Sequence, residues 1–346
     1  MNDTRRSILE SLADGPVSGP TLADTLDVSR AAVWKHVEGL REDGFEIESG
    51  PDGYALTGIP AYNGPAIEYG LEAPFSIEYH ESIASTNARA RALASDGRAD
   101  VVVLADEQTG GKGRLDREWS SPSGGIWMSV CCRPTIPPAR APLYTLAAAV
   151  ATARTAREAG VDARIKWPND VVVPGSGADA GLESDDSATD DDSSYRKLSG
   201  VLTEMEGETD RVEWLVVGIG VNANFDAGEL PAGSTTLREE LRAGGGDRGA
   251  ETDTAGENGE PGDVDRRLFV QRLLEEFHTL RTDLECVLPA WRELTLTIGQ
   301  RVRVELPDET VVGEAIDIAE YGGLVIEDDG GRVTVSAGDC THLRPT

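Results

Sequence analysis

The chain has 346 residues, 39% of them hydrophobic, which is enough for two or three domains with apolar cores. Its 62 acidic and 32 basic residues give a formal net charge of −30. Its apolar runs are shorter than the roughly 18 residues of a membrane span, and its first residues lack a signal-peptide core, so the sequence predicts a cytoplasmic protein without a membrane partner.

Residues 1–60 predict a winged helix-turn-helix domain. A helix is expected over residues 3–13, a second is capped by Ser18, and a third, SRAAVWKHVEGLRED, is capped by Ser29. A hairpin with the turn GPDG follows as the wing. Three helices and a wing are typical of DNA-binding domains, and a small packing domain is the alternative.

The third helix of this domain carries the predicted DNA-binding residues. They are Ser29, Arg30, Lys35 and His36. No acidic residue lies between Ser29 and Glu38, although the chain as a whole is strongly acidic. This local absence of acid favours contact with DNA phosphates and base edges.

A linker is predicted at residues 57–64, and a mixed α/β domain at residues 65–290. Apolar periodicity predicts its strands at residues 75–81, 101–107, 125–132, 164–167, 197–205 and 213–221. Its helices are expected at residues 85–94, 143–160 and 266–284. Residues 297–346 predict a small β domain with strands at 301–306, 311–318, 323–329 and 332–337. The expected fold class is therefore α+β.

Two acidic stretches interrupt the central domain. Residues 174–194 hold seven acids and no base, and residues 243–265 hold seven acids and one base. Their Gly, Ser, Asp and Glu content is typical of disordered surface loops. The first is framed by strand-like segments and is interpreted as an elongated turn.

Lysine is scarce: all but four of the 32 basic residues are arginine. An acidic, lysine-poor surface is typical of a protein that works in concentrated salt, where the Debye length is roughly 3 Å at 1 M. An ordinary acidic protein is the alternative. Solubility explains none of the remaining lysines, which makes them candidate functional residues: Lys35, Lys112, Lys166 and Lys197.

Cysteine and histidine spacing indicates no metal centre and no disulfide framework. The adjacent Cys131 and Cys132 are expected to be buried in a strand, and the four histidines are scattered. No permanently bound metal is expected.

The segment GKGRLDREW, residues 111–119, lies between two predicted strands. Its glycines let the backbone approach a ligand, and Lys112, Arg114 and Arg117 add positive charge. Backbone N–H groups beside cations suit phosphate or carboxylate. The spacing of a Walker loop is absent, and an arginine-rich surface loop is the alternative.

Polar residues also gather before a helix and after a strand. In STN, Ser85, Thr86 and Asn87 can cap the helix or bind a polar ligand at its N-terminus. In KWPND, Pro168 ends the strand that contains Lys166, and a tight turn follows.

Two further strands carry lysine, glycine and asparagine. In KLSG, Lys197 either pairs with the acidic stretch before it or points into a cleft. In the second case Gly200, which has no side chain, would keep the floor of that cleft open. In GIGVN, Gly218 and Gly220 precede Asn222, whose amide can read a purine edge. Each signal is weak alone.

The joint order of these motifs, STN, EQTGGKGR…W, KWPND, KLSGVL and GIGVN, resembles the biotin–protein ligases over most of residues 80–225. The N-terminal domain resembles that of the two-function ligases that are also biotin-operon repressors. The C-terminal β segment resembles their SH3-like β-barrel. Lipoate and octanoate transferases share the central fold, but this chain lacks their GGGxVxHD-type segment.

The resemblance implies an enzyme that joins biotin and ATP, with Mg²⁺, into biotinoyl-5′-AMP and passes biotin to a lysine of a carboxylase carrier domain. Positioning and cations would suffice for both steps. Lys197, Arg114 and Lys112 would be the catalytic cations. The implied biotin-binding residues are Ser85, Thr86, Asn87, Gln108, Gly111, Lys112, Gly113, Arg114, Lys197 and Gly200. The implied nucleotide-binding residues are Arg114, Trp119, Lys166, Asn169, Asp170, Gly218, Gly220 and Asn222.

Two residues depart from the family pattern. Lys112 replaces the usual arginine, so the guanidinium group that could bind an oxyanion at two points is lost. Asp116 replaces a usual glycine and places an acid beside the expected phosphates. The resemblance leaves open a homodimer, binding to operator DNA, and a biotin-sensing repressor without ligase activity.

Overall fold

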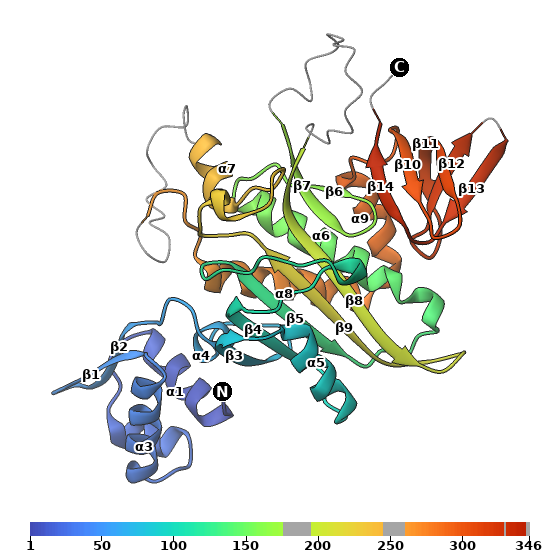
Figure 1. Ribbon diagram of the computed structural model, residues 1–346. Coiled ribbons are helices and arrows are strands. Elements are labelled where there is room, and N and C mark those ends of the chain that lie inside the picture. Colours follow the sequence, from blue (N-terminus) through green and yellow to red (C-terminus); the bar gives the residue numbers. More distant parts are fainter. Residues whose placement is uncertain (176–194, 245–259, 329, 344–346) are drawn as a thin grey trace.

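The computed structural model describes residues 1–175, 195–244, 260–328 and 330–343. These residues form sheets of two, seven and five strands with helices between them, which confirms the α+β class (Figure 1). The two acidic stretches lie mostly outside the described residues, so their predicted disorder stays a prediction.

The N-terminal domain is a winged helix-turn-helix, as predicted. Ser18 and Ser29 cap its second and third helices by accepting hydrogen bonds from Thr21 N at 3.2 Å and Ala32 N at 3.1 Å. The domain has an apolar core of its own, and the apolar residues that recur along the third helix pack into it. The elements are α1 (Asp3–Ala13), α2 (Gly19–Thr25), α3 (Arg30–Glu42), β1 (Glu46–Gly50) and β2 (Gly53–Gly58).

The central sheet has the order β3-β4-β5-β9-β8-β7-β6, in which β3 and β4 are parallel and the other neighbours antiparallel. Its strands are β3 (Ser76–Ile83), β4 (Val101–Gln108), β5 (Ile126–Cys132), β6 (Arg164–Lys166), β7 (Asp170–Pro174), β8 (Tyr195–Gly207) and β9 (Val212–Val221). Its helices are α4 (Gly64–Glu68), α5 (Thr86–Ser95), α6 (Pro142–Glu158), α7 (Leu237–Gly244), α8 (Arg266–Thr282) and α9 (Val287–Leu294).

Each face of this sheet meets different helices. On β9, Val217, Ile219 and Val221 point into the main core, which also contains α6 and α8. Val216 points to the opposite face, where α5 packs. Because side chains alternate along a strand, Gly218 and Gly220 share that opposite face and leave space above it.

The C-terminal domain is a five-stranded antiparallel sheet of order β13-β12-β11-β10-β14, at the opposite end of the molecule from the winged helix (Figure 1). Its strands are β10 (Arg301–Glu305), β11 (Thr310–Ile318), β12 (Leu324–Asp328), β13 (Gly331–Val335) and β14 (Asp339–His342). Trp167 joins it to the central sheet, since its indole N–H donates to Gly322 O at 3.0 Å and its backbone N–H to Thr297 Oγ1 at 3.0 Å.

Several elements differ from the expected ones. The predicted linker is short, because β2 runs to Gly58 and Asn63 caps α4 by accepting from Ala66 N at 2.8 Å. Strands β7 and β14 and helices α4, α7 and α9 were not predicted. Each has eight residues or fewer, too few for periodicity to stand out, and tertiary pairing stabilises them.

Candidate functional site

A pocket of about 510 Å³ lies on the α5 face of the central sheet and reaches the C-terminal domain. This volume suits a small-molecule ligand. The structure brings together there these predicted residues: Ser85, Thr86, Asn87, Gln108, Lys112, Gly113, Arg114, Trp119, Lys166, Asn169, Asp170, Lys197, Gly200, Gly218, Gly220 and Asn222.

Glycines keep the floor of the pocket open. Gly200 of β8 and Gly220 of β9 are register partners, and both meet the indole of Trp119. A Cβ at Gly220 would lie 2.7 Å from Trp119 Nε1, and one at Gly200 would lie 3.1 Å from Trp119 Cζ3. A Cβ at Gly218 would lie 2.1 Å from Asn87 Oδ1. These strands therefore need glycine so that Trp119 and Asn87 can lie against the sheet.

One end of the pocket is a network of neutral polar groups. Ser85 caps α5 by accepting from Ala88 N at 3.3 Å. Thr86 Oγ1 donates to Gln108 Oε1 at 3.0 Å, and Ser129 Oγ lies 2.8 Å from Thr86 Oγ1 and 2.6 Å from Asn87 Oδ1. Such a network offers donors and acceptors at fixed positions to an uncharged polar ligand.

The loop of residues 111–119 closes on itself as a small hairpin. Gly113 N donates to Arg117 O at 2.8 Å, and Trp119 N donates to Gly111 O at 3.0 Å. Gly111 does not line the pocket. A Cβ at Gly111 would lie 2.5 Å from Trp119 O, so this glycine allows the hairpin to close instead of offering room to a ligand.

Two cations of the pocket are fixed by partners from distant segments. Lys197 Nζ lies 2.7 Å from Asp170 Oδ1 and 5.1 Å from the centre of the Trp119 ring. Arg114 donates to Asn169 Oδ1 at 3.1 Å and to Gly338 O of the C-terminal domain at 3.0 Å. Fixed cations of this kind are preorganised to stabilise negative charge.

The other two cations of the loop are more exposed. Lys112 Nζ lies 2.9 Å from Asp116 Oδ1, and hydrogen bonding to this ammonium lowers the pKa of Asp116. The Lys112 side chain is 63% exposed. Arg117 pairs with Asp339 of β14. Asp116 thus pairs with Lys112, the cation that the sequence predicts beside the ligand.

The predicted nucleotide-binding residues occupy different environments. Lys166, at the end of β6, has its Nζ 4.5 Å from the Tyr195 ring centre. Asn169 donates to Val201 O at 2.9 Å, which orients its oxygen toward Arg114. Asn222 is 2% exposed and donates to Thr235 O at 3.0 Å, so its amide also holds the chain beside the pocket.

Several residues that line or support the pocket were not foreseen. Ser129 was detectable, because it is the polar residue in the apolar strand IWMSVCC. Residues 230–234 and 339–341 also line the pocket, and neither carries a distinctive motif. They come from a loop after β9 and from the C-terminal domain, so only the tertiary fold brings them here.

On α3 the predicted DNA-binding residues lie at the N-terminal half of the helix. Arg30 and Lys35 are exposed and His36 is half-buried, whereas the Ser29 hydroxyl caps the helix. Trp34, 58% exposed, lies between them. This face is cationic and apolar, as a surface that enters a DNA groove would be.

Within the described residues, no group of three or more His, Cys, Asp or Glu side chains is arranged to hold a metal ion. No described helix is both long enough and apolar enough to cross a membrane. No disulfide joins the four cysteines. Burial raises the pKa of Cys131 to about 12 and that of Cys132 to about 11.

Three family models match the chain. The biotin/lipoate A/B protein ligase family matches residues 79–222, the biotin protein ligase C-terminal domain matches residues 297–343, and a helix-turn-helix domain matches residues 4–55. Together they span all three sheets of the structure.

Curated relatives align along most of the chain. The bifunctional ligase/repressor BirA of Bacillus subtilis is 32% identical over 336 residues, 93% of each chain. The biotin–[acetyl-CoA-carboxylase] ligase of Mycobacterium tuberculosis is 32% identical over 274 residues, 75% of this chain and 86% of its own. The biotin protein ligase of Aquifex aeolicus, solved with biotin and ATP, has a TM-score of 0.55 at 22% identity, over 78% of this chain and 99% of its own, and so shows a shared fold. The chain belongs to the biotin protein ligase family, with a helix-turn-helix domain ahead of the ligase domain.

Proposed function

We propose that the chain is an ATP-dependent biotin–[biotin carboxyl carrier protein] ligase. A carboxylate oxygen of biotin attacks the α-phosphorus of ATP, which gives biotinoyl-5′-AMP and pyrophosphate. The amine of a carrier-domain lysine then attacks the acyl carbon, which gives an amide, AMP and a proton. Both steps move negative charge onto oxygen atoms, and fixed cations stabilise that charge.

The observation that carries the proposal is the gathering of cations in one pocket of a strongly acidic chain. Lys112, Arg114, Lys166 and Lys197 all line it, although the formal net charge is −30. Three of the four lysines in the sequence are therefore in this pocket. A concave, partly desolvated site lined by cations concentrates an anionic substrate.

We assign the neutral polar end of the pocket to biotin. Ser85, Thr86, Asn87 and Gln108 suit a ureido ring, which both donates and accepts hydrogen bonds. Lys197 and Arg114 would meet the carboxylate, with Lys112 nearby. The role of the glycines would be to shape the backbone around the ligand, and not to take part in the chemistry; they are Gly111, Gly113 and Gly200.

We assign the end next to the C-terminal domain to the nucleotide. Arg114, Lys166 and Asn169 line that end, where Arg114 also meets Gly338. Gly218, Gly220, Asn222 and Trp119 would shape the surface beneath the ligand. Mg²⁺ would arrive with ATP, and Asp170 would mainly hold Lys197.

We propose as partners a carrier domain of an acyl-CoA carboxylase and, through α3, operator DNA. The M. tuberculosis relative is named for its carboxylase substrate, and the B. subtilis relative for a repressor. A homodimer would suit a two-fold operator. The domain bounds 1–60, 65–290 and 297–346 remain our proposal.

We place this reaction in the cytoplasm, where ATP and acyl-CoA carboxylases occur, and in concentrated salt. A net charge of −30 causes strong self-repulsion that salt screens. Activity that rises between low and molar salt would support this assignment, and activity that only falls would contradict it.

Two alternatives are separated by simple measurements. A repressor without ligase activity would bind biotin and DNA but release no pyrophosphate. A lipoate or octanoate transferase would label a carrier with those acids and not with biotin.

The decisive experiment incubates the full chain with biotin, Mg-ATP and a carrier domain at low and high salt. Pyrophosphate release and carrier labelling are followed together. We expect both to depend on biotin and ATP. Normal folding with no labelling at any salt concentration would contradict the proposed function.

A further inference from the structure

The loop of residues 226–236 lies between β9 and α7 and forms one wall of the pocket. Residues 230–234 line the pocket directly. The loop also holds the backbone of Lys197, because Lys197 N donates to Gly233 O at 2.7 Å and Thr235 N donates to Lys197 O at 2.9 Å. Any movement of this wall therefore changes both the shape of the pocket and the place of its lysine.

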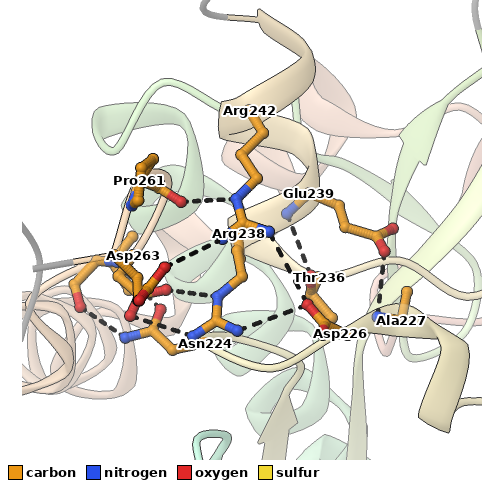
Figure 2. Close-up of polar contacts among 11 residues, drawn as sticks. Asn224, Asp226, Ala227, Thr236, Arg238, Glu239, Arg242, Pro261 and Asp263 are labelled. Carbon is orange, nitrogen blue, oxygen red and sulfur yellow. Dashed lines mark hydrogen bonds and ion pairs between the residues drawn. The ribbon is translucent and has the colours of Figure 1, made fainter. Parts of the chain in front are cut away.

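The start of the loop is tied to α7, the helix that follows the loop's end (Figure 2). Asp226 Oδ1 lies 3.6 Å from an Arg238 terminal nitrogen and 3.9 Å from one of Arg242. The backbone N–H of Ala227 donates to Glu239 Oε1 at 3.1 Å. Both ends of the loop are thus fixed to one helix.

Arg238 is itself held from the other side by Asp263 (Figure 2). Arg238 Nε lies 2.5 Å from Asp263 Oδ1, and a terminal nitrogen lies 3.1 Å from Asp263 Oδ2. The Asp263 side chain is 0% exposed and that of Arg238 is 14% exposed. A planar guanidinium fork held by a buried carboxylate has little freedom, which leaves its remaining terminal nitrogen aimed at Asp226.

We propose that Arg238 is a positioning residue for ligation: anchored on Asp263, it holds the loop of residues 226–236 in place as a wall of the pocket through Asp226. The inference rests on the proposed function, since it takes the enclosed ligand to be ATP and then the adenylate. Arg238 does not line the pocket, so it acts through the loop rather than on the ligand. Loosening it raises the KM for ATP and speeds escape of the adenylate, with a smaller change in kcat.

The first test is Asp226→Asn, a change at a side chain that is 72% exposed and need not disturb the core. We expect the KM for ATP to rise by about two- to fivefold, the size expected for an exposed ion pair. Amide hydrogen exchange in residues 227–236 should become faster, and that of residues 301–342 should not change. The matched control is Glu260→Gln, since Glu260 is 62% exposed and lies 4.0 Å from Arg242 but outside the loop.

The second test is Arg238→Lys, which retains the charge but has a single nitrogen to offer. One ammonium cannot reproduce a two-point contact with Asp263 and also meet Asp226, so the KM for ATP should rise by about tenfold. Adding Asp226→Asn to this variant should produce a smaller further change than Asp226→Asn produces in the wild type, because the two residues share one contact and only the weaker contact of Asp226 with Arg242 remains to be lost. Should Arg238→Lys fail to fold, the comparison of Asp226→Asn with Glu260→Gln decides alone.

The outcomes separate the two proposals. No pyrophosphate release by the wild-type chain would overturn the proposed function, and the exchange rates of residues 227–236 would still test the role of Arg238. If the wild-type chain is active but Asp226→Asn matches Glu260→Gln in both KM and exchange, the positioning role of Arg238 is overturned.

Discussion

The cations of the pocket and those of the N-terminal half of α3 come from the same residue types but are held in opposite ways. In the pocket, Lys197 lies 2.7 Å from Asp170, and Arg114 is fixed by Asn169 and Gly338. On α3, Arg30 and Lys35 are exposed, and neither has an acidic partner within the described chain. A paired cation is oriented before the ligand arrives, whereas an unpaired exposed one is free to follow the outline of a DNA backbone.

The largest expected effect comes from removing the central paired cation. Lys197→Ala should lower pyrophosphate release by about a hundredfold or more, the usual loss when one stabilising donor is removed. Stability should change by only on the order of 1 kcal/mol, because the ion pair is partly exposed. Lys35→Ala is the control and should retain full ligase activity. Equal activity in the two variants would mean that Lys197 merely pairs with Asp170.

The second-largest effect is expected from adding a methyl group to the glycine floor of the pocket. Gly220→Ala places a methyl group 2.7 Å from Trp119 Nε1, so the indole must shift and its contact with Lys197 must change. Overpacking of this kind should reduce kcat/KM by about tenfold. At Gly244 a Cβ meets nothing within 4 Å, which makes Gly244→Ala the matched control. Similar kinetics for both variants would show that Trp119 does not need this surface.

The third prediction tests the unpaired cations of α3. Arg30→Ala and Lys35→Ala should each weaken DNA binding several-fold and reduce the slope of log K against log salt by about 0.9 for each lost phosphate contact. Carrier labelling should stay unchanged, because α3 lies at the opposite end of the molecule from the C-terminal domain (Figure 1), and residues 339–341 of that domain line the pocket. A salt slope equal to that of the wild type would argue that α3 does not meet DNA phosphates.

The smallest effect is expected from freeing a paired cation. Asp116→Gly removes the partner of Lys112 at a residue with φ +57°, which glycine adopts without strain. The KM for ATP should fall about twofold at low salt and change little at 1 M, where exposed pairs are screened. Hydrogen bonding to Lys112 lowers the pKa of Asp116, so its carboxylate is charged at and above neutral pH and the effect should not vary there. An unchanged KM at low salt would mean that Asp116 does not compete with phosphate.

Local features of the sequence were enough to predict most elements. The caps at Ser18 and Ser29 and the apolar spacing of α3 define short-range structure, so the winged helix was predicted nearly to its ends. The same holds for the long apolar strands and for α6 and α8, where the periodic pattern is long. The ordered motifs placed the pocket residues as well, apart from Gly111, because each motif lies near one end of a strand or at the start of a helix on the same face of the sheet.

The sequence by itself therefore determined the domain order, the main elements and the cations that line the pocket. Only the tertiary structure decided what each cation meets: Asp170 beside Lys197, and Gly338 and Asp339 of the C-terminal domain beside Arg114 and Arg117. It also brought Asp226 and Asp263 to Arg238. The reason is that these contacts join segments that are far apart in the chain, and only sheet register and domain packing bring such segments together.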